Sequence, residues 1–461
     1  VTWDGTRDRE CPRNWSLSRK SLVVLSSSLL AFIVGFGSSI FAPASPELTS
    51  EFGVSVTVSR LSVSLWIIGL GAISGPFSDI FGHRLALAIS MLGLCLFQLP
   101  AALATNFQTI LISRTVAGTF GSSISFIIPR IYTDLYSPIP RSLALTASIM
   151  AFHLGTTIAP LVSAHLLASP SPDGSPPWRW LSWLILLLAG PVSLFAILFA
   201  IPETSTPILL KRKARRLRLQ TGNWALHAQS EEAPTIQRRL LLQTYLSKPL
   251  HMLTTELLLS LFSLHLGIVH GVTYLILYAI PFAFQSRGWT TTQSHLPLLS
   301  VALGGILAGL AATIPLSGLP KLWRRGLGTE STPETRILPT MILGSVILPL
   351  GLVWLGWTSN THWLVQTIAV FPIGMGCVFV LAAGTAHVLE VFGTHAESAL
   401  AGHLVVRGLV SASFPLWVGD IYQRLGTGWA SSVVALGCLL VVPVPVVFWV
   451  WGRRIREGGR Y

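Results

Sequence analysis

The sequence has 461 residues, of which 11% are charged and 51% are hydrophobic, and its mean hydropathy is +0.65. Soluble proteins carry about 25% charged residues. Apolar runs of about twenty residues, each long enough to cross a hydrocarbon core of about 30 Å as a helix, recur along the chain. The composition excludes a soluble multidomain protein and predicts an all-α polytopic membrane protein.

The positions of the apolar runs predict twelve transmembrane helices arranged as two six-helix bundles. These spans lie near residues 21–42, 60–79, 85–105, 108–130, 143–167, 181–201, 252–284, 295–317, 337–357, 363–389, 397–420 and 429–451. They divide the chain into a cytoplasmic N-terminal tail (1–20), an N-terminal bundle (21–202), a cytoplasmic central loop (203–250), a C-terminal bundle (251–452) and a cytoplasmic C-terminal tail (453–461). Pro160 and Pro415 are 255 residues apart, as are Asp79 and Glu334, which indicates a twofold repeat with a binding site near the midplane between the halves.

The net charge of +13 would suit a nucleic-acid partner, but the placement of the basic residues argues against one. If the N-terminus is inside, twenty-four of the 31 Lys and Arg residues flank the spans on the cytoplasmic side and four on the other side. Because Lys and Arg are enriched in cytoplasmic loops, we expect both termini in the cytoplasm. The cluster from Lys211 to Asn223 predicts contact with anionic lipid head groups, and the later part of the loop reads as a solvated linker.

The N-terminal tail, WDGTRDRECPRNW from Trp3 to Trp15, predicts an interfacial segment that anchors the first span. The stretch GPFSDIFGHR from Gly75 to Arg84 separates two apolar runs and predicts a tight interfacial turn. Gly75 and Gly82 permit close approach of helices there. Asp79 offers a carboxylate to a helix N-terminus or to a cation.

The fourth span carries Arg114, followed by Gly118 one turn later and by Gly121. An arginine inside a bilayer costs about 2.5–3.5 kcal/mol on insertion scales, so Arg114 is expected to face a cavity or a partner; the alternative is an arginine that extends toward the outer interface. At the inner end of the span, Arg130 and Asp134 are four residues apart, which predicts an ion pair within the helix.

The fifth span contains His153, Gly155 and Pro160, and predicts a face of small residues with a proline bend. In the seventh span His270, Tyr274 and Tyr278 form a stripe at i, i+4 and i+8.

The later spans add three ionisable groups. His387 and Glu390 are three residues apart in the tenth span, so the carboxylate is expected to raise the pKa of the imidazole, and Arg407 lies near the midplane in the eleventh span. For each single membrane histidine, the alternative is a neutral ring bonded to a neighbour.

Several of these patterns resemble the major facilitator superfamily, and in particular the fungal twelve-span drug:proton antiporter branch. The pattern G-x-x-x-D-x-x-G-x-R at residues 75–84 is similar to the family's loop between spans two and three, with His83 as a departure. The tail resembles the W-D-G lead-in of the fungal exporters, and R-x-x-x-G-x-x-G resembles the fourth-span motif. The fifth-span antiporter motif is only partly matched, because Ala159, Ser163 and Ala164 replace glycines, which leaves the direction of transport open.

The resemblance implies a secondary transporter that exports hydrophobic or amphipathic small molecules, such as drugs, toxins or secondary metabolites, by proton-coupled alternating access. It implies a monomer in the plasma membrane. Substrate binding or proton coupling is predicted for Arg114, His153, His270, Tyr274, Tyr278, His387, Glu390 and Arg407. A conformational motif is predicted at Gly75, Asp79, Gly82, Arg84, Gly118, Gly155 and Pro160, with Asp79, Gly82 and Arg84 holding the cytoplasmic ends of the halves together in the outward-facing state.

The sequence contains no metal-ligand spacing, nucleophile motif or phosphate-binding loop, and its four cysteines form no close-spaced pair. We therefore expect no catalytic residue, metal or cofactor, and predict that the protein is not an enzyme. Two alternative functions stay open: a solute importer or uniporter on the same fold, and a transport-inactive membrane receptor or scaffold.

Overall fold

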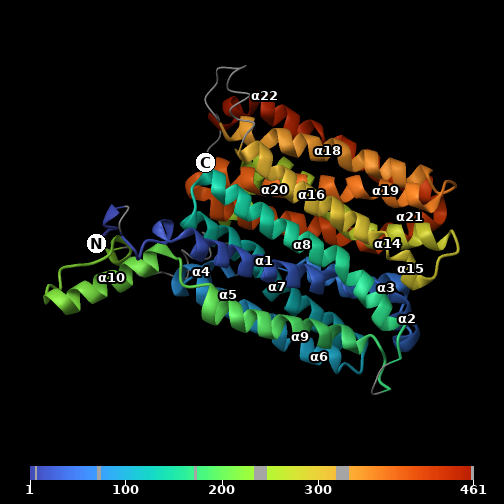
Figure 1. The fold of residues 1–461 in the computed structure, drawn as a ribbon, viewed down its shortest axis with the longest axis horizontal. Helices are drawn as coiled ribbons and strands as arrows, with labels where there is room; N and C mark the ends of the chain where they lie inside the picture. Colours follow the sequence, from blue (N-terminus) through green and yellow to red (C-terminus); the bar gives the residue numbers. More distant parts are fainter. Residues whose placement is uncertain (6–7, 70–73, 171–173, 233–246, 318–331, 458–461) are drawn as a thin grey trace.

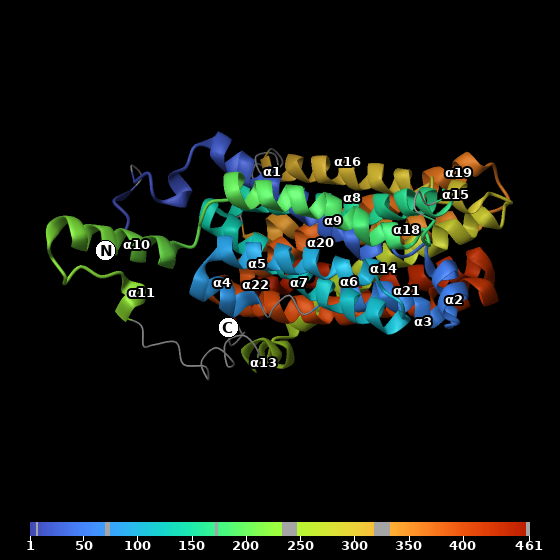
Figure 2. The ribbon, with the colours of Figure 1, turned by 90° about the horizontal axis from the view of Figure 1, so that it is seen from below.

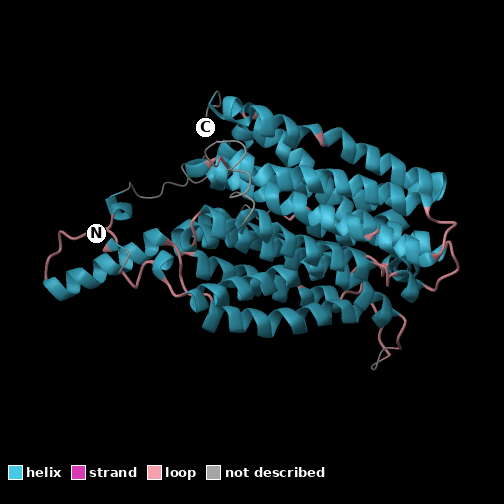
Figure 3. Cartoon of the chain, turned by 45° about the horizontal axis from the view of Figure 1, so that its top comes forward, coloured by secondary structure: helices cyan, strands magenta, loops and turns pink. Residues whose placement is uncertain are grey.

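The computed structural model describes residues 1–5, 8–69, 74–170, 174–232, 247–317 and 332–457, and within these ranges the regular secondary structure is helical throughout (Figure 3). The first half contains α1 (Leu17–Ser39), α2 (Ser45–Phe52), α3 (Val56–Ile67), α4 (Ser74–Phe81), α5 (His83–Leu96), α6 (Gln98–Ala102), α7 (Phe107–Leu135), α8 (Pro138–Leu167), α9 (Arg179–Phe195) and the π-helical turn η4 (Ala196–Ala200). The tail has one short helical turn, η2 (Pro12–Asn14).

The central loop and the second half follow. The loop contains α10 (Thr206–Thr221) and α11 (Gln229–Glu232). The second half contains α13 (Lys248–Thr255), α14 (Leu257–Gln285), α15 (Thr291–Ser294), α16 (Leu298–Ser317), α18 (Pro333–Trp357), α19 (Trp363–Ala369), α20 (Phe371–Val391), η6 (Gly393–His395), α21 (Ala396–Val441) and α22 (Pro443–Glu457).

These helices supply twelve membrane spans. In the described ranges, ten helical units are long and apolar enough to cross a bilayer. One of them, Ala396–Gly452, holds two spans, because Gly426 has non-helical backbone angles (φ 70°, ψ 174°) and Tyr422 Oη lies 2.9 Å from Ser431 Oγ across the bend. The second span is formed by α3 and α4. The predicted all-α fold of twelve helices is confirmed.

The spans run side by side along the long axis of the molecule (Figure 1). The N-terminal tail and α10 extend beyond one end of the bundle, which we call the tail end; α2, α15 and α19 lie at the far end (Figures 1 and 2). The first half packs chiefly through α1 on α8, and the second through α14 on α21, its equivalent in the repeat. The halves meet where α8 contacts α16 and α20, and where α3 contacts α21.

The stretch predicted as a turn is mostly helical. Ser74–Phe81 forms α4, with Gly82 N donating to Ser78 O at 3.0 Å, and the chain reverses only at Gly82, whose φ is +97°. A glycine adopts this φ without the steric cost that a Cβ would add. Gly75 and Asp79 are therefore helical residues. In the sequence, the loop of the second half that corresponds to residues 75–84 carries the basic stretch Lys321–Arg325, which lies outside the described residues.

Candidate functional site

An ion cluster joins the two halves at the tail end. The guanidinium of Arg130, on α7, contacts Asp79 Oδ1 on α4 and donates to Glu397 Oε1 on α21 at 2.7 Å. A second nitrogen of Arg130 donates to Gly75 O at 3.4 Å. Asp79 thus reaches the second half through Arg130. The sequence predicted a pair between Arg130 and Asp134, which this arrangement replaces, since Asp134 instead lies 3.1 Å from His83 Nε2.

A second polar cluster links the halves at the same end. Glu390, on α20, binds Arg336 of α18, accepts a hydrogen bond from Ser142 Oγ of α8 at 3.3 Å, and lies 3.9 Å from Arg141 of α8. Its carboxylate is therefore held by arginines. His387, one turn earlier on α20, is fully buried and stacks on Phe262 with ring centroids 5.0 Å apart.

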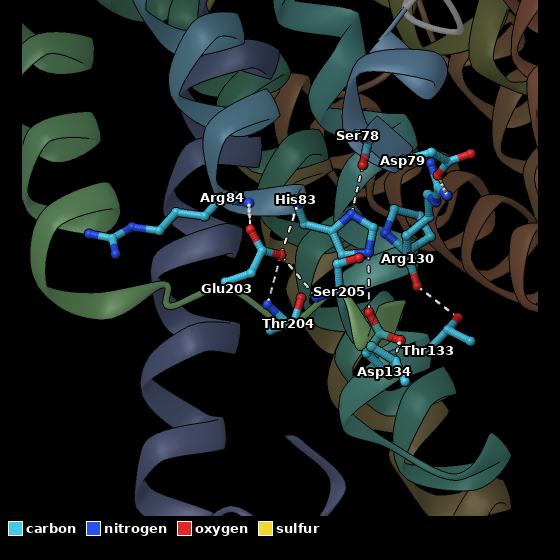
Figure 4. Close-up of polar contacts among 12 residues, drawn as sticks. Ser78, Asp79, His83, Arg84, Arg130, Thr133, Asp134, Glu203, Thr204 and Ser205 are labelled. Atoms are coloured by element: carbon cyan, nitrogen blue, oxygen red, sulfur yellow. Dashed lines mark hydrogen bonds and ion pairs between the residues drawn. The ribbon is translucent and has the colours of Figure 1, made fainter. Parts of the chain in front are cut away.

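Gly82 and Arg84 act within the first half. Glu203, just after η4, accepts hydrogen bonds from His83 N at 3.0 Å and Arg84 N at 3.3 Å, and so caps the start of α5 (Figure 4). A Cβ at Gly82 would lie 2.1 Å from Glu203 Oε2. The Arg84 side chain donates to Ile197 O in η4 at 3.0 Å. Of the three residues predicted to hold the halves together, Asp79 is linked to the second half through Arg130, and the other two fix α5 to η4 and to Glu203 just after it.

A cavity lies between the halves, lined by α1, α7 and α8 on one side and by α14, α20 and α21 on the other. Its walls are mostly apolar. The polar residues among the lining are Ser125, Ser148, His270, Thr385 and Arg407. No aspartate or glutamate belongs to the described lining.

His270 is positioned by three neighbours. Its ring stacks on Phe152 of the first half with centroids 5.8 Å apart and meets Tyr274 edge-on at 5.2 Å. Its Nδ1 lies 3.1 Å from Ser411 Oγ, which itself donates to the backbone carbonyl of Arg407 at 2.6 Å. His270 and Arg407, predicted from separate spans, are thus brought to one wall of the cavity.

Polar contacts also join the halves on the far-end side of the cavity. Tyr274 Oη donates to Ser38 Oγ at 3.0 Å, which ties α14 to α1. The guanidinium of Arg60, on α3, lies 5.2 Å from the centre of the Tyr278 ring on α14. The stripe of His270, Tyr274 and Tyr278 therefore faces the first half along its length.

Arg114 is not part of the cavity lining. It is fully buried and donates to the carbonyls of Ser62 at 3.0 Å and Gly37 at 2.8 Å, and it lies 4.2 Å from the Trp66 ring centroid. A Cβ at Gly118 would lie 2.4 Å from Trp66 O, so this glycine lets α7 approach α3. Arg114 and Gly118 together hold α1, α3 and α7 in contact.

His153 and Gly155 lie at helix contacts. The His153 ring is 1% exposed, and a Cβ at Gly305 of α16 would lie 2.9 Å from its Cδ2, so His153 occupies the contact between the halves. A Cβ at Gly155 would lie 2.1 Å from Phe32 O of α1. Pro160 lies inside α8, five residues further along.

Four charged residues of these clusters were not predicted from the sequence: Arg141, Glu203, Arg336 and Glu397. Glu203 stands in the motif-like segment Pro202-Glu203-Thr204-Ser205 directly after a span, which was a usable signal. Glu397 and Arg130 are 267 residues apart, and nothing in the local sequence of either one indicates the other.

Two pseudo-symmetric bundles with a cavity between them define a membrane transporter architecture. The family model for the Major Facilitator Superfamily matches residues 27–415. The chain is 36% identical to an ascochitine biosynthesis cluster MFS transporter of Didymella fabae, over 100% of this chain and 89% of the relative, and 30% identical to a multidrug transporter of Candida glabrata, over 100% and 79%. The chain belongs to the major facilitator superfamily.

Solved structures agree on the fold. The proton:xylose symporter XylE bound to 6-bromo-6-deoxy-D-glucose superimposes with a TM-score of 0.69 at 16% identity, covering 95% of this chain and 96% of the symporter. The human organic anion transporter MFSD10 superimposes with a TM-score of 0.59 at 18% identity, covering 94% and 100%.

Proposed function

We propose that this protein is a secondary active transporter that exports hydrophobic or amphipathic small molecules by proton-coupled alternating access. The observation that carries the proposal is the largely apolar cavity between the halves, with separate sets of polar contacts closing it on each side. Relatives named for the ascochitine and citrinin biosynthesis clusters and for multidrug transport support export of such compounds.

The contacts at the two ends would control which side of the cavity is open. Opening the cavity at the tail end requires separation of Arg130 from Glu397 and of Arg141 and Ser142 from Glu390. Opening it at the far end requires separation of Tyr274 from Ser38. Each set is a discrete group of contacts that breaks when its own side of the cavity opens, as rigid-body rocking of two repeats demands.

Proton entry provides the driving force in this proposal. Protonatable groups lie where the halves meet: His153 against α16, His270 in the cavity wall, and Glu390 in the second cluster. When one of these groups gains or loses a proton, the change of its charge can bias one arrangement of contacts over the other. We propose His387, which is buried beside Phe262, as a further coupling residue.

We further propose a monomer in the plasma membrane with both termini in the cytoplasm, since the basic residues gather at the tail end. The functional units are the bundles 21–202 and 251–452, joined by the loop 203–250. Three cations of α10 bind acids: Lys213 pairs with Asp4 and Asp8, Arg216 with Glu10, and Arg218 with Glu231. Anionic lipid head groups would contact the other basic residues of this helix, Lys211, Arg212 and Arg215.

The proposal is tested by accumulation of fluorescent amphipathic compounds in cells that lack their own exporters. Expression of the chain should lower accumulation, and a protonophore should restore it. Higher accumulation on expression, or a flux indifferent to the protonophore, would favour an importer or a uniporter instead.

A further inference from the structure

Arg407 has an unusual environment for a cation inside a bundle. Arg407 is one of the residues that line the cavity, yet among the described residues no side chain or backbone group forms an ion pair or hydrogen bond with its guanidinium. A charge within a membrane protein normally finds a partner, because an unpaired one is costly there. The described lining supplies no carboxylate that would serve as that partner.

His270 offers a second polar atom without a partner beside it. The single hydroxyl hydrogen of Ser411 is directed to the Arg407 carbonyl at 2.6 Å, so Ser411 Oγ accepts from His270 Nδ1 at 3.1 Å. In a neutral ring this leaves Nε2 as an acceptor. Nε2 is buried and has no hydrogen-bond partner among the described residues. The two groups lie on the same wall of the cavity.

The rest of the cavity suits an apolar body. Val34, Ile124 and Phe152 of the first half face Leu381 and Leu404 of the second. A molecule that fits must bury apolar surface against these walls and place its polar end toward Arg407. Cationic amphipaths would meet an unpaired positive charge there, and neutral ones would leave the guanidinium without a counter-charge.

We infer that Arg407 is the anion-binding residue of the transport cavity, and that the preferred substrates are amphipathic molecules with one acidic group, such as a carboxylate, bound by its guanidinium. This inference rests on the proposed function, because it treats the bound molecule as a substrate of the transporter. Binding to Arg407 can nevertheless be measured separately from transport. His270 Nε2 accepts a hydrogen bond from a neighbouring donor on the same molecule. An arginine fork binds a carboxylate with charge-assisted hydrogen bonds, and so selects the anion over an equally apolar neutral analogue.

The test uses three pyrene probes that share one apolar body: pyrenebutyrate, its neutral amide, and a pyrenebutyl-trimethylammonium cation. Binding to the purified full chain in lipid nanodiscs is followed by pyrene fluorescence, and export of each probe is followed in cells. The variants are Arg407→Gln, which removes the charge; Arg407→Lys, which keeps it; and Arg424→Gln, which removes an exposed charge from the same helix outside the cavity.

The inference predicts that the wild type binds the carboxylate about tenfold or more tightly than the amide or the cation, since a charged hydrogen-bonded partner is worth that much. Arg407→Gln abolishes this preference, while Arg407→Lys and Arg424→Gln keep it. Equal binding of the three probes, or a preference that survives Arg407→Gln, overturns the inference even if all three are exported. A preference for the carboxylate that depends on Arg407, without any export, supports the inference and contradicts the proposed function.

Discussion

Two arginines that lie within the spans of this protein have opposite surroundings. Arg114 donates to backbone carbonyls of α1 and α3 and lies beside the Trp66 ring, whereas Arg407 faces a cavity with no partner in the described residues. The first is a group that holds helices together, and the second is available to a ligand. The same residue type, each within a span, therefore serves packing in one half and recognition in the other.

This contrast predicts the effect of removing each charge. Arg114→Gln leaves buried carbonyls without their donor and should lower the free energy of unfolding by about 3 kcal/mol, with loss of membrane abundance. Arg407→Gln, which breaks no described contact, should leave thermal stability in detergent unchanged. Thermal melts of the two purified variants measure this difference, and equal melting temperatures would contradict the assignment of Arg114 to packing.

Asp79 is predicted to matter for transport more than for folding. Asp79→Ala removes one of the two carboxylates of the Arg130 cluster, but Arg130 keeps Glu397 at 2.7 Å. If the contact between the halves is weakened by about 1 kcal/mol, the ratio of the conformation closed at the tail end to the open one changes about fivefold. Transport should therefore fall while membrane abundance stays constant. The matched control is Asp420→Ala, at an exposed position of α21. An equal fall in abundance would show that Asp79 serves folding.

At the scale of elements, glycines set how closely the helices pack. A Cβ at Gly155 would lie 2.1 Å from Phe32 O, and one at Gly35 would lie 2.1 Å from Phe152 O, so α1 and α8 approach each other backbone to backbone. Gly271 plays the equivalent part in the second half, where a Cβ would lie 2.4 Å from the Phe414 ring of α21. Small residues at such contacts let membrane helices pack closely.

Gly155→Val should therefore separate α1 from α8 and lower thermal stability by about 2 kcal/mol or more, because side chains forced into a packed contact cost about 1–3 kcal/mol. The control is Gly190→Ala on α9, where an added Cβ would meet no other atom within 4 Å. A small gain in stability is expected there, because alanine favours the helix more than glycine does. Melting temperatures and surface expression of the two variants provide the measurement. No loss for Gly155→Val would mean that the α1–α8 contact tolerates a larger residue.

The N-terminal tail is a second element with a defined contact, since Lys213 of α10 donates to Asp8 Oδ2 at 2.8 Å and to Asp4 Oδ2 at 2.6 Å. The hydrogen bond from Lys213 lowers the pKa of Asp8 from 3.8 to about 2. A lowered pKa stabilises the docked tail at pH values above the unfolded pKa, and this contribution is lost as the pH falls through about 2.

We expect hydrogen exchange of the tail, corrected for intrinsic rates, to show constant protection from pH 7 to pH 5. Lys213→Ala should raise exchange of the tail across that range. Lys211→Ala, which removes a neighbouring charge, should leave it unchanged. Protection that disappears between pH 7 and pH 5 in the wild type would contradict the ion-paired docking of the tail.

At the scale of the whole molecule, hydropathy was enough to predict the all-helical fold and its twelve spans. Each span needs about twenty apolar residues to cross the bilayer, whatever helices it packs against. The pairing across the halves was not predictable in the same way. In the sequence, the nearer ion-pair partner for Arg130 was Asp134. Only the three-dimensional packing brings the carboxylate of Glu397, 267 residues away, to 2.7 Å from the Arg130 guanidinium.

Local patterns identified candidate residues better than they assigned roles. His270 and Arg407 were both predicted, but their meeting at one cavity wall depends on the contact of α14 with α21. The apolar character of Ser74–Phe81 did not distinguish a helix from a turn, because one glycine, Gly82, reverses the chain. The roles of Glu203 and Arg84 likewise follow from the position of η4.

The most direct test of proton-driven export uses the purified protein in liposomes, with a fluorescent amphipathic compound that the chain exports from cells. With the vesicle interior made acidic, protons leave as the compound enters, and the account predicts accumulation above that of protein-free liposomes, abolished by a protonophore. Accumulation driven instead by an alkaline interior, or equilibration indifferent to the gradient, would contradict antiport and leave the shared fold with a different transport reaction.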